Sequence, residues 1–179
     1  MNVADGSTDA LGWLNERQRD GGIDRVQLPE GVAGELWLCG KRAAAARYLD
    51  PAWDLVVCLV EPHELAGHHP EYLDWVRSAS GRVLWNPVPD LHAPELEPMQ
   101  EVTARIASML ASGGCVLVHC AAGFGRSGTV AVCVLIGLGL DADDARAAVS
   151  AARPGAGPEA GAQRDLVAGF RRTGSGDLR

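Results

Sequence analysis

Two apolar segments on either side of a run of small residues leave this sequence few ways to fold. Val116–Val118 and Val130–Leu140 are apolar, whereas residues 119–129 between them are rich in glycine and alanine. A short apolar run favours a strand covered on both faces, and a longer one favours a buried helix. The sequence therefore predicts a strand over Cys115–His119, a small-residue loop, and a buried helix over Arg126–Leu138.

The rest of the chain alternates between strand-like and helix-like segments. Further strands are predicted over Glu35–Cys39, Asp54–Val60 and Arg82–Trp85, where apolar residues gather. Helices are predicted over residues 11–19, 42–49, 94–111, 141–152 and 159–171, and residues 63–78 are predicted to be helical in pieces. Such alternation is typical of α/β proteins. We expect a central, mostly parallel sheet flanked by helices on both faces.

The length of 179 residues suits a single folded domain. Residues 1–30 are polar and rich in turn formers, so we expect a loosely held N-terminal arm over this segment. The folded domain is expected over residues 31–179, where no repeat or linker divides the sequence.

Composition and charge weigh against several classes of function. The net charge of −7 disfavours nucleic acid or an anionic membrane as a main partner, because both attract basic surfaces. No apolar run reaches the roughly 18 residues of a membrane span. The five cysteines are unclustered and no secretory signal is recognisable, so we expect a cytoplasmic protein with reduced thiols. Its runs of Ala, Gly and Arg suggest a bacterial source.

The loop between the predicted strand and helix has the features of an anion-binding site. Successive backbone N–H groups in such a loop can curl around an anion at the positive end of the helix dipole. Gly123 and Gly125 allow backbone conformations that a side chain would penalise. The residues expected to bind phosphate are Ala121, Ala122, Gly123, Phe124, Gly125 and Arg126.

Cys120, at the start of this loop, is the expected nucleophile. A helix N-terminus beside cations favours the thiolate, which is the reactive form of cysteine. Arg126 can form two parallel hydrogen bonds to phosphate oxygens and stabilise the charge of the transition state. The hydroxyl of Ser127 can stabilise the sulfur when it leaves, and His119 and Thr129 are expected to support the loop.

Transfer of a phosphoryl group leaves an alkoxide or phenoxide, which an acid should protonate. Asp90 is the candidate, because it ends the proline-rich stretch Pro87–Asp90 about 30 residues before Cys120. His92 is a second candidate in the same loop.

The segment His119–Thr129 resembles the signature of the protein tyrosine phosphatase superfamily, in which His-Cys is followed, after five residues, by Arg and Ser or Thr. Its place about two-thirds along the chain is similar to that in tyrosine and dual-specificity enzymes. Val88–Pro94 resembles the Pro-Asp loop of small phosphatases, especially relatives of the cyclin-dependent-kinase-associated phosphatase. The resemblance covers residues 35–172 and implies the three-layer phosphatase fold.

The resemblance also implies an activity and further roles. A member would hydrolyse phosphotyrosine, and also phosphoserine or phosphothreonine, on a protein substrate through a phosphocysteine intermediate, without metal or cofactor. Gln163, which follows Arg153–Ala156, would hold the water of the second step. Cys58 would be a redox partner of Cys120, with a plain buried strand cysteine as the alternative. The oligomeric state stays open.

Other functions compete with this interpretation. A phosphatase for phosphoinositides or other small phosphomonoesters uses the same loop, but commonly with a lysine inside it, and this loop has none. A rhodanese-type sulfurtransferase would lack Arg126–Gly128, and a phospho-binding pseudophosphatase would have lost the cysteine, arginine or acid. His63, His68 and His69 lack the spacing of a zinc site, so we expect no metal.

Overall fold

The computed structural model describes residues 21–78 and 81–170, and these contain a five-stranded sheet of order β1-β2-β5-β3-β4. The strands are β1 Ile23–Val26, β2 Glu35–Gly40, β3 Leu55–Cys58, β4 Val83–Trp85 and β5 Cys115–Cys120. β1 pairs antiparallel with β2, and every other neighbouring pair is parallel. The predicted α/β fold with a mostly parallel sheet is confirmed.

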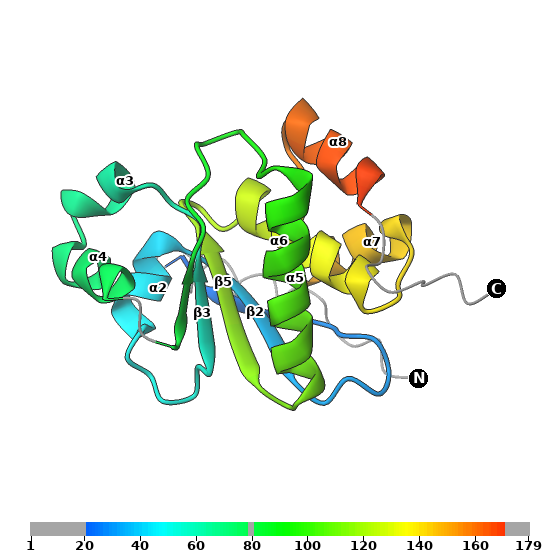
Figure 1. Cartoon of the computed structure of the whole chain (residues 1–179), viewed down its shortest axis with the longest axis horizontal. Coiled ribbons are helices and arrows are strands. Elements are labelled where there is room, and N and C mark those ends of the chain that lie inside the picture. The colour runs from blue at the N-terminus through cyan, green and yellow to red at the C-terminus, as the bar shows by residue number, and fades with distance from the viewer. Residues whose placement is uncertain (1–20, 79–80, 171–179) are drawn as a thin grey trace, which may run out of the picture.

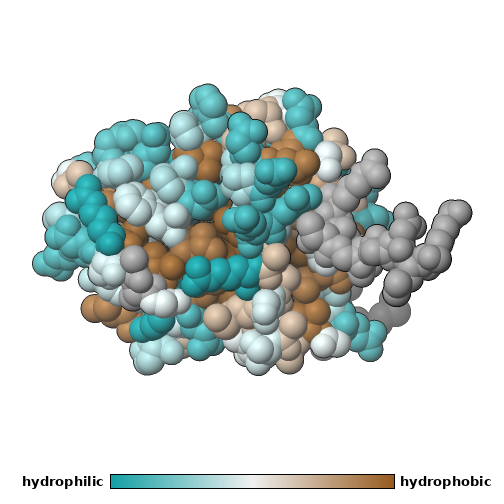
Figure 2. All heavy atoms as spheres, viewed as in Figure 1, coloured by the Kyte–Doolittle hydropathy of each residue, from teal (hydrophilic) through white to brown (hydrophobic). Residues whose placement is uncertain are grey.

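Helices cover both faces of this sheet (Figure 1). One side carries α2 Lys41–Arg47, α3 Pro62–Ala66 and α4 Pro70–Arg77. The other side carries α5 Leu96–Ala111, α6 Gly125–Gly137, α7 Ala142–Ala152 and α8 Gly161–Gly169. The face seen in Figure 2 mixes apolar and hydrophilic surface, and hydrophilic side chains predominate along its upper edge, near α3 and α8.

The apolar segments singled out in the sequence form the centre of the molecule. Val116–Val118 on β5 are fully buried, and α6 is buried from Gly125 to Ile136. A helix that is apolar on all sides needs neighbours all round, and α6 has them in β5, α5, α7 and α8. The β5–α6 pair therefore has little freedom to shift, and the loop between its two elements is held from both ends.

The parallel strands bring several loops to one edge of the sheet, because the carboxyl ends of parallel strands meet there. We name the two loops that matter most the Cys120 loop (residues 120–126) and the Asp90 loop (residues 86–94). Backbone hydrogen bonds connect the segments that leave this edge: Leu59 N–H donates to the carbonyl of His119, and Val88 N–H donates to that of Leu59. Lys41 N–H likewise donates to the carbonyl of Ala121, at 3.0 Å.

The expected N-terminal arm over residues 1–30 needs a correction where the structure describes it. Ile23–Val26 form β1, which pairs with β2 in register from Ile23 opposite Cys39 to Val26 opposite Leu36. Residues 21–30 therefore belong to the folded domain. The polar composition misled the prediction, because an edge strand needs only one buried face, and here Val26 provides the buried side chain. Residues 1–20, including the helix predicted over 11–19, lie outside the described residues.

A buried ion pair fastens this strand to the rest of the domain. Arg153 is 1% exposed, and its Nη1 lies 2.6 Å from Asp24 Oδ2. Its Nη2 donates to the carbonyl of Ala122 at 2.9 Å, and its guanidinium lies over the ring of Phe124, 4.8 Å from the centroid. Arg153 therefore connects β1 to the Cys120 loop.

We expect Asp24→Ala to lower the free energy of unfolding by about 3 kcal/mol, because it leaves the buried charge of Arg153 uncompensated. Urea denaturation measures this change. Asp143→Ala is the matched control, since Asp143 pairs with Arg146 at the surface with its side chain 95% exposed, and should cost less than about 1 kcal/mol. Equal losses in the two variants would contradict the role given to Arg153.

Candidate active site

The Cys120 loop closes tightly on the end of β2. Gly123 has a φ of 83°, and a Cβ there would lie 2.5 Å from the carbonyl carbon of Cys39. Only glycine combines this left-handed conformation with so close an approach of two backbones. The close contact holds the loop in the compact curve that an anion cradle requires.

The thiol of Cys120 lies at the bottom of this curve. Its Sγ accepts a hydrogen bond from Gly123 N–H at 3.2 Å and lies 3.3 Å from Ser127 Oγ. Ser127 is fully buried on the first turn of α6. Both contacts can stabilise negative charge on sulfur, as the sequence analysis expected of Ser127.

His119 is fully buried behind the loop, where it faces Tyr72 of α4. Its Nε2 lies 2.5 Å from Tyr72 Oη, and its Nδ1 lies 3.3 Å from the carbonyl oxygen of Cys120. Burial lowers the pKa of His119 to about 4, so the ring is neutral at neutral pH. A neutral ring that donates from Nδ1 to the carbonyl leaves Nε2 to accept a hydrogen bond from the tyrosine.

Arg126 is held by a carboxylate that the sequence analysis did not assign to the site. Nη1 and Nη2 donate to the two oxygens of Glu64 at 2.7 and 2.9 Å, and Nη1 also donates to the carbonyl of Val88 at 2.8 Å. Burial opposes ionisation of Glu64, but its hydrogen bonds to Arg126 and to the backbone of Glu61 keep its pKa below the usual value. The bidentate pair orients the guanidinium plane.

Glu64 reaches Arg126 because it lies in the first turn of α3, directly after the buried strand β3. Its Oε1 also accepts the N–H of Glu61, and Lys41 Nζ donates to its carbonyl at 2.8 Å. Glu61, Pro62 and Glu64 have the spacing of a helix start, which the sequence shows. The pairing with Arg126 depends on the tertiary fold, so no sequence signal could have found it.

Asp90 lies at the exposed rim of the site. Its Oδ1 is 3.2 Å from Arg126 Nη2, and its side chain is 74% exposed. The turn around it is held by the 3.1 Å bond from His92 N–H to the carbonyl of Pro89 and by Leu91 in the left-handed region, with φ at 61°. The structure thus brings Asp90 to Arg126, although 36 residues separate them.

Gln163 is close to the site, but its amide is buried and hydrogen-bonded at both ends. It is 1% exposed, and its Oε1 accepts the N–H of Glu159 at 2.8 Å. Its Nε2 donates to the carbonyl of His92 at 3.1 Å, and Thr129 Oγ1 lies 3.4 Å from Oε1. Thr129 also donates to the carbonyl of Gly125 at 2.7 Å. Gln163 and Thr129 therefore tie α8 and α6 to the Asp90 loop.

Cys58 lies on the other face of the sheet from Cys120. It is the register partner of His119 on β5, and neighbouring residues of a strand point to opposite faces. Burial raises the pKa of Cys58 to about 12, and its thiol interacts with Tyr72. Pairing with Cys120 under oxidation stays a prediction, and it would require the end of β5 to move.

Two further features bear on ligands. Within residues 21–78 and 81–170, no group of three or more His, Cys, Asp and Glu side chains is arranged to hold a metal ion. In the same described part of the chain, no helix has the length and apolarity needed to cross a membrane.

The chain matches a known family over most of its length. Residues 52–174 match the model described as Swiss Army Knife protein, DSP-PTPase phosphatase domain. The match includes both the Asp90 loop and the Cys120 loop.

Solved phosphatase structures share the fold. Tk-PTP in its active form is 31% identical, over 76% of this chain and 89% of that chain, with a TM-score of 0.60. Kinase associated phosphatase, with its catalytic cysteine replaced by serine, is 18% identical over 82% of this chain and 91% of that chain, with a TM-score of 0.69. PTPMT1 in complex with PI(5)P is 21% identical over 75% of this chain and 88% of that chain, with a TM-score of 0.61. The last two show a likeness of fold alone.

The buried His119 predicts a loss of stability in acid. Between pH 6.5 and about 4 the unfolded chain binds a proton at this histidine and the folded chain does not, so the free energy of unfolding falls as the pH falls through this window. The contribution amounts to about 3 kcal/mol over the whole window. Thermal melting at pH 7 and pH 4.5 should therefore show a larger drop for the wild type than for His119→Asn. Parallel drops in the two proteins would contradict a neutral buried ring.

Proposed function

Because this chain belongs to the dual-specificity type of the protein tyrosine phosphatase superfamily, we propose that it hydrolyses phosphotyrosine in proteins, with phosphoserine and phosphothreonine as further substrates. One observation carries the proposal: the guanidinium of Arg126, the last residue of the Cys120 loop, is held by Glu64 and lies 3.2 Å from the Asp90 carboxylate. A nucleophile, a phosphate clamp and an acid are thus gathered at one edge of the sheet.

In the proposed first step, Cys120 Sγ attacks phosphorus and the bond to the leaving oxygen breaks. The backbone amides of the Cys120 loop and Arg126 bind the phosphoryl oxygens and stabilise their charge in the transition state. A phosphate oxygen takes the place of Asp90 on Nη2 of Arg126, 3.2 Å away. This exchange releases the carboxylate of Asp90 from Arg126. Once it has taken a proton from solvent, Asp90 gives that proton to the leaving oxygen.

In the second step, water hydrolyses the phosphocysteine and the sulfur leaves as thiolate. Ser127 Oγ and Gly123 N–H, at 3.3 and 3.2 Å from Sγ, stabilise that thiolate. The positive field of both steps comes from Arg126 and the backbone amides, so the proposed reaction uses no metal ion.

Two features of the site favour a protein substrate over a phosphoinositide, which is the alternative. Ala121 and Ala122 place no positive charge beside the phosphate position, whereas a multiply charged head group needs cations. The site also carries two exposed acids, Asp90 beside Arg126 and Glu159 against Gly125, which repel additional phosphates. A phospho-binding pseudophosphatase, the alternative outside enzymes, is disfavoured because Cys120, Arg126 and Asp90 are all in place.

We expect the wild type to hydrolyse p-nitrophenyl phosphate and a phosphotyrosine peptide in reductant with EDTA, and Cys120→Ser to release no phosphate from either. Substituting the attacking sulfur abolishes formation of the intermediate, whereas removing metal leaves it untouched. A phosphoinositide in mixed micelles serves as the competing substrate. Turnover of that lipid with none of the peptide would favour the alternative, and wild-type turnover lost in EDTA would contradict the thiol mechanism.

Asp90→Ala should lower kcat by about 10²–10⁴-fold on the phosphotyrosine peptide, because the phenoxide then leaves without a proton. The loss should be smaller on p-nitrophenyl phosphate, since its leaving group is more acidic. The matched control is Glu95→Ala, which removes another exposed carboxylate, at the start of α5 five residues after Asp90. If Asp90→Ala lowers both activities equally, Asp90 is not the acid.

A further inference from the structure

Gln163, the residue expected to hold the water of the second step, is buried. Gln163 is 1% exposed, its Oε1 accepts from the backbone of Glu159, and its Nε2 donates to the carbonyl of His92. An amide that is 1% exposed and hydrogen-bonded at both ends has little access to water from the solvent. An exposed side chain with a free acceptor beside the same loop is better suited to hold the attacking water of the proposed reaction.

Glu159 is in the right place. Its carboxylate lies directly against Gly125, so that a Cβ on Gly125 would collide with Glu159 Oε2. Gly125 is the last residue of the loop before Arg126 and the first residue of α6. The carboxylate therefore faces the end of the Cys120 loop where a bound phosphoryl group would lie.

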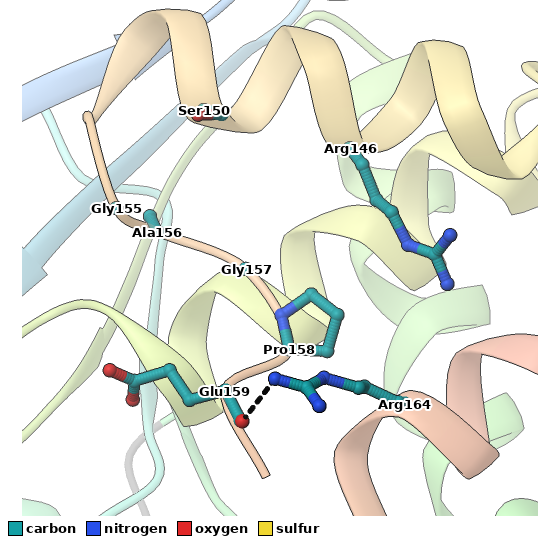
Figure 3. Close-up of a pocket in the computed structure, with 8 residues that line it drawn as sticks. All are labelled: Arg146, Ser150, Gly155, Ala156, Gly157, Pro158, Glu159 and Arg164. Atoms are coloured by element: carbon teal, nitrogen blue, oxygen red, sulfur yellow. Dashed lines mark hydrogen bonds between the residues drawn. The ribbon is translucent and has the colours of Figure 1, made fainter. Parts of the chain in front are cut away.

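The backbone of Glu159 is fixed, whereas its side chain is available. Glu159 N–H donates to Gln163 at 2.8 Å, and Arg164 Nη2 donates to the Glu159 carbonyl at 2.9 Å. Figure 3 shows the carboxylate directed away from Arg146 and Arg164, which line the pocket of about 420 Å³ beside it. Among residues 21–78 and 81–170, no group makes a hydrogen bond or ion pair with this carboxylate. A residue whose backbone is fixed and whose carboxylate has no protein partner is well suited to bind a water molecule.

We propose that Glu159 holds the water that hydrolyses the phosphocysteine, and that Gln163 positions Glu159. This inference rests on the proposed function and assigns a part of it. The carboxylate of Glu159 accepts a hydrogen bond from the water and directs its oxygen at phosphorus.

The step balances with the residues at hand. The water oxygen forms the new bond to phosphorus as the bond from phosphorus to Cys120 Sγ breaks, and the electron pair of that bond returns to sulfur. One water proton passes to the carboxylate of Asp90, which lost its own proton to the leaving oxygen in the first step. The other proton stays on the phosphate oxygen.

The charges around Glu159 are compatible with this role. Arg126 supplies the positive charge at the phosphate position, and the helix start at Gly125 adds a partial positive charge. A carboxylate accepts hydrogen bonds but has none to donate. It therefore favours water, a donor, over an additional phosphate group, which would be repelled.

Rapid-mixing kinetics with p-nitrophenyl phosphate test the proposal, because nitrophenol reports formation of the intermediate and inorganic phosphate reports its breakdown. Glu159→Ala should release one nitrophenol per enzyme in a fast burst, and then turn over about 10- to 100-fold more slowly than the wild type. Glu159→Gln, which keeps an acceptor oxygen, should recover most of the steady rate. The matched control is Glu101→Ala, an exposed acid on α5, which should behave as wild type.

A second readout separates this role from a structural one. Removing the water's acceptor leaves room for other nucleophiles, so added ethylene glycol should trap the phosphoryl group more often in Glu159→Ala. The ratio of phosphorylated glycol to inorganic phosphate should rise several-fold over the wild type, while the melting temperature stays unchanged.

The outcomes distinguish this inference from the proposed function. A Glu159→Ala variant with no burst, and with the wild-type ratio of products, would overturn the assignment while the phosphatase activity stands. A wild type that releases no nitrophenol would overturn the proposed function, and the role of Glu159 with it.

Discussion

The bidentate pair between Glu64 and Arg126 is the contact on which the arrangement of the site depends. A guanidinium is planar, and fixing its plane in advance favours two parallel bonds to a phosphate. Here the carboxylate of Glu64 and the carbonyl of Val88 fix it, and Nη2 also lies 3.2 Å from Asp90 Oδ1. Breaking such a buried pair leaves an uncompensated charge, which is costly. The contact therefore restrains α3, the Asp90 loop and α6 together.

The sheet makes this contact possible by aligning the ends of its strands. α3 follows β3, the Asp90 loop follows β4, and the Cys120 loop follows β5, and these three strands are neighbours in parallel. Arg153 adds a connection from the other side, since it joins Asp24 of β1 to the carbonyl of Ala122. The Cys120 loop is thus braced by elements from both halves of the chain, and it keeps its curve through contacts that lie outside the loop itself.

The proposed reaction uses two carboxylates of the site, Asp90 as the acid and Glu159 as the acceptor for the attacking water. Asp90 contacts Arg126, whereas Glu159 lies against Gly125. Both are exposed, which lets them exchange protons and water with the solvent, but their backbones are held by turns and by Gln163. Gln163 donates to the carbonyl of His92, so the Asp90 loop and the residue proposed to hold water are connected through one buried amide.

Sequence alone determined the α/β class, the β5–α6 unit and the family, because those depend on local apolar runs and on a motif that is continuous along the chain. The catalytic roles of Cys120, Arg126 and Asp90 stay predictions, although the structure brings Asp90 to Arg126 as they require. Only the tertiary structure revealed β1, the pairing of Glu64 with Arg126, and the approach of the Glu159 carboxylate to Gly125. Each of these depends on which side chains meet after folding, and spacing along the chain says nothing about that.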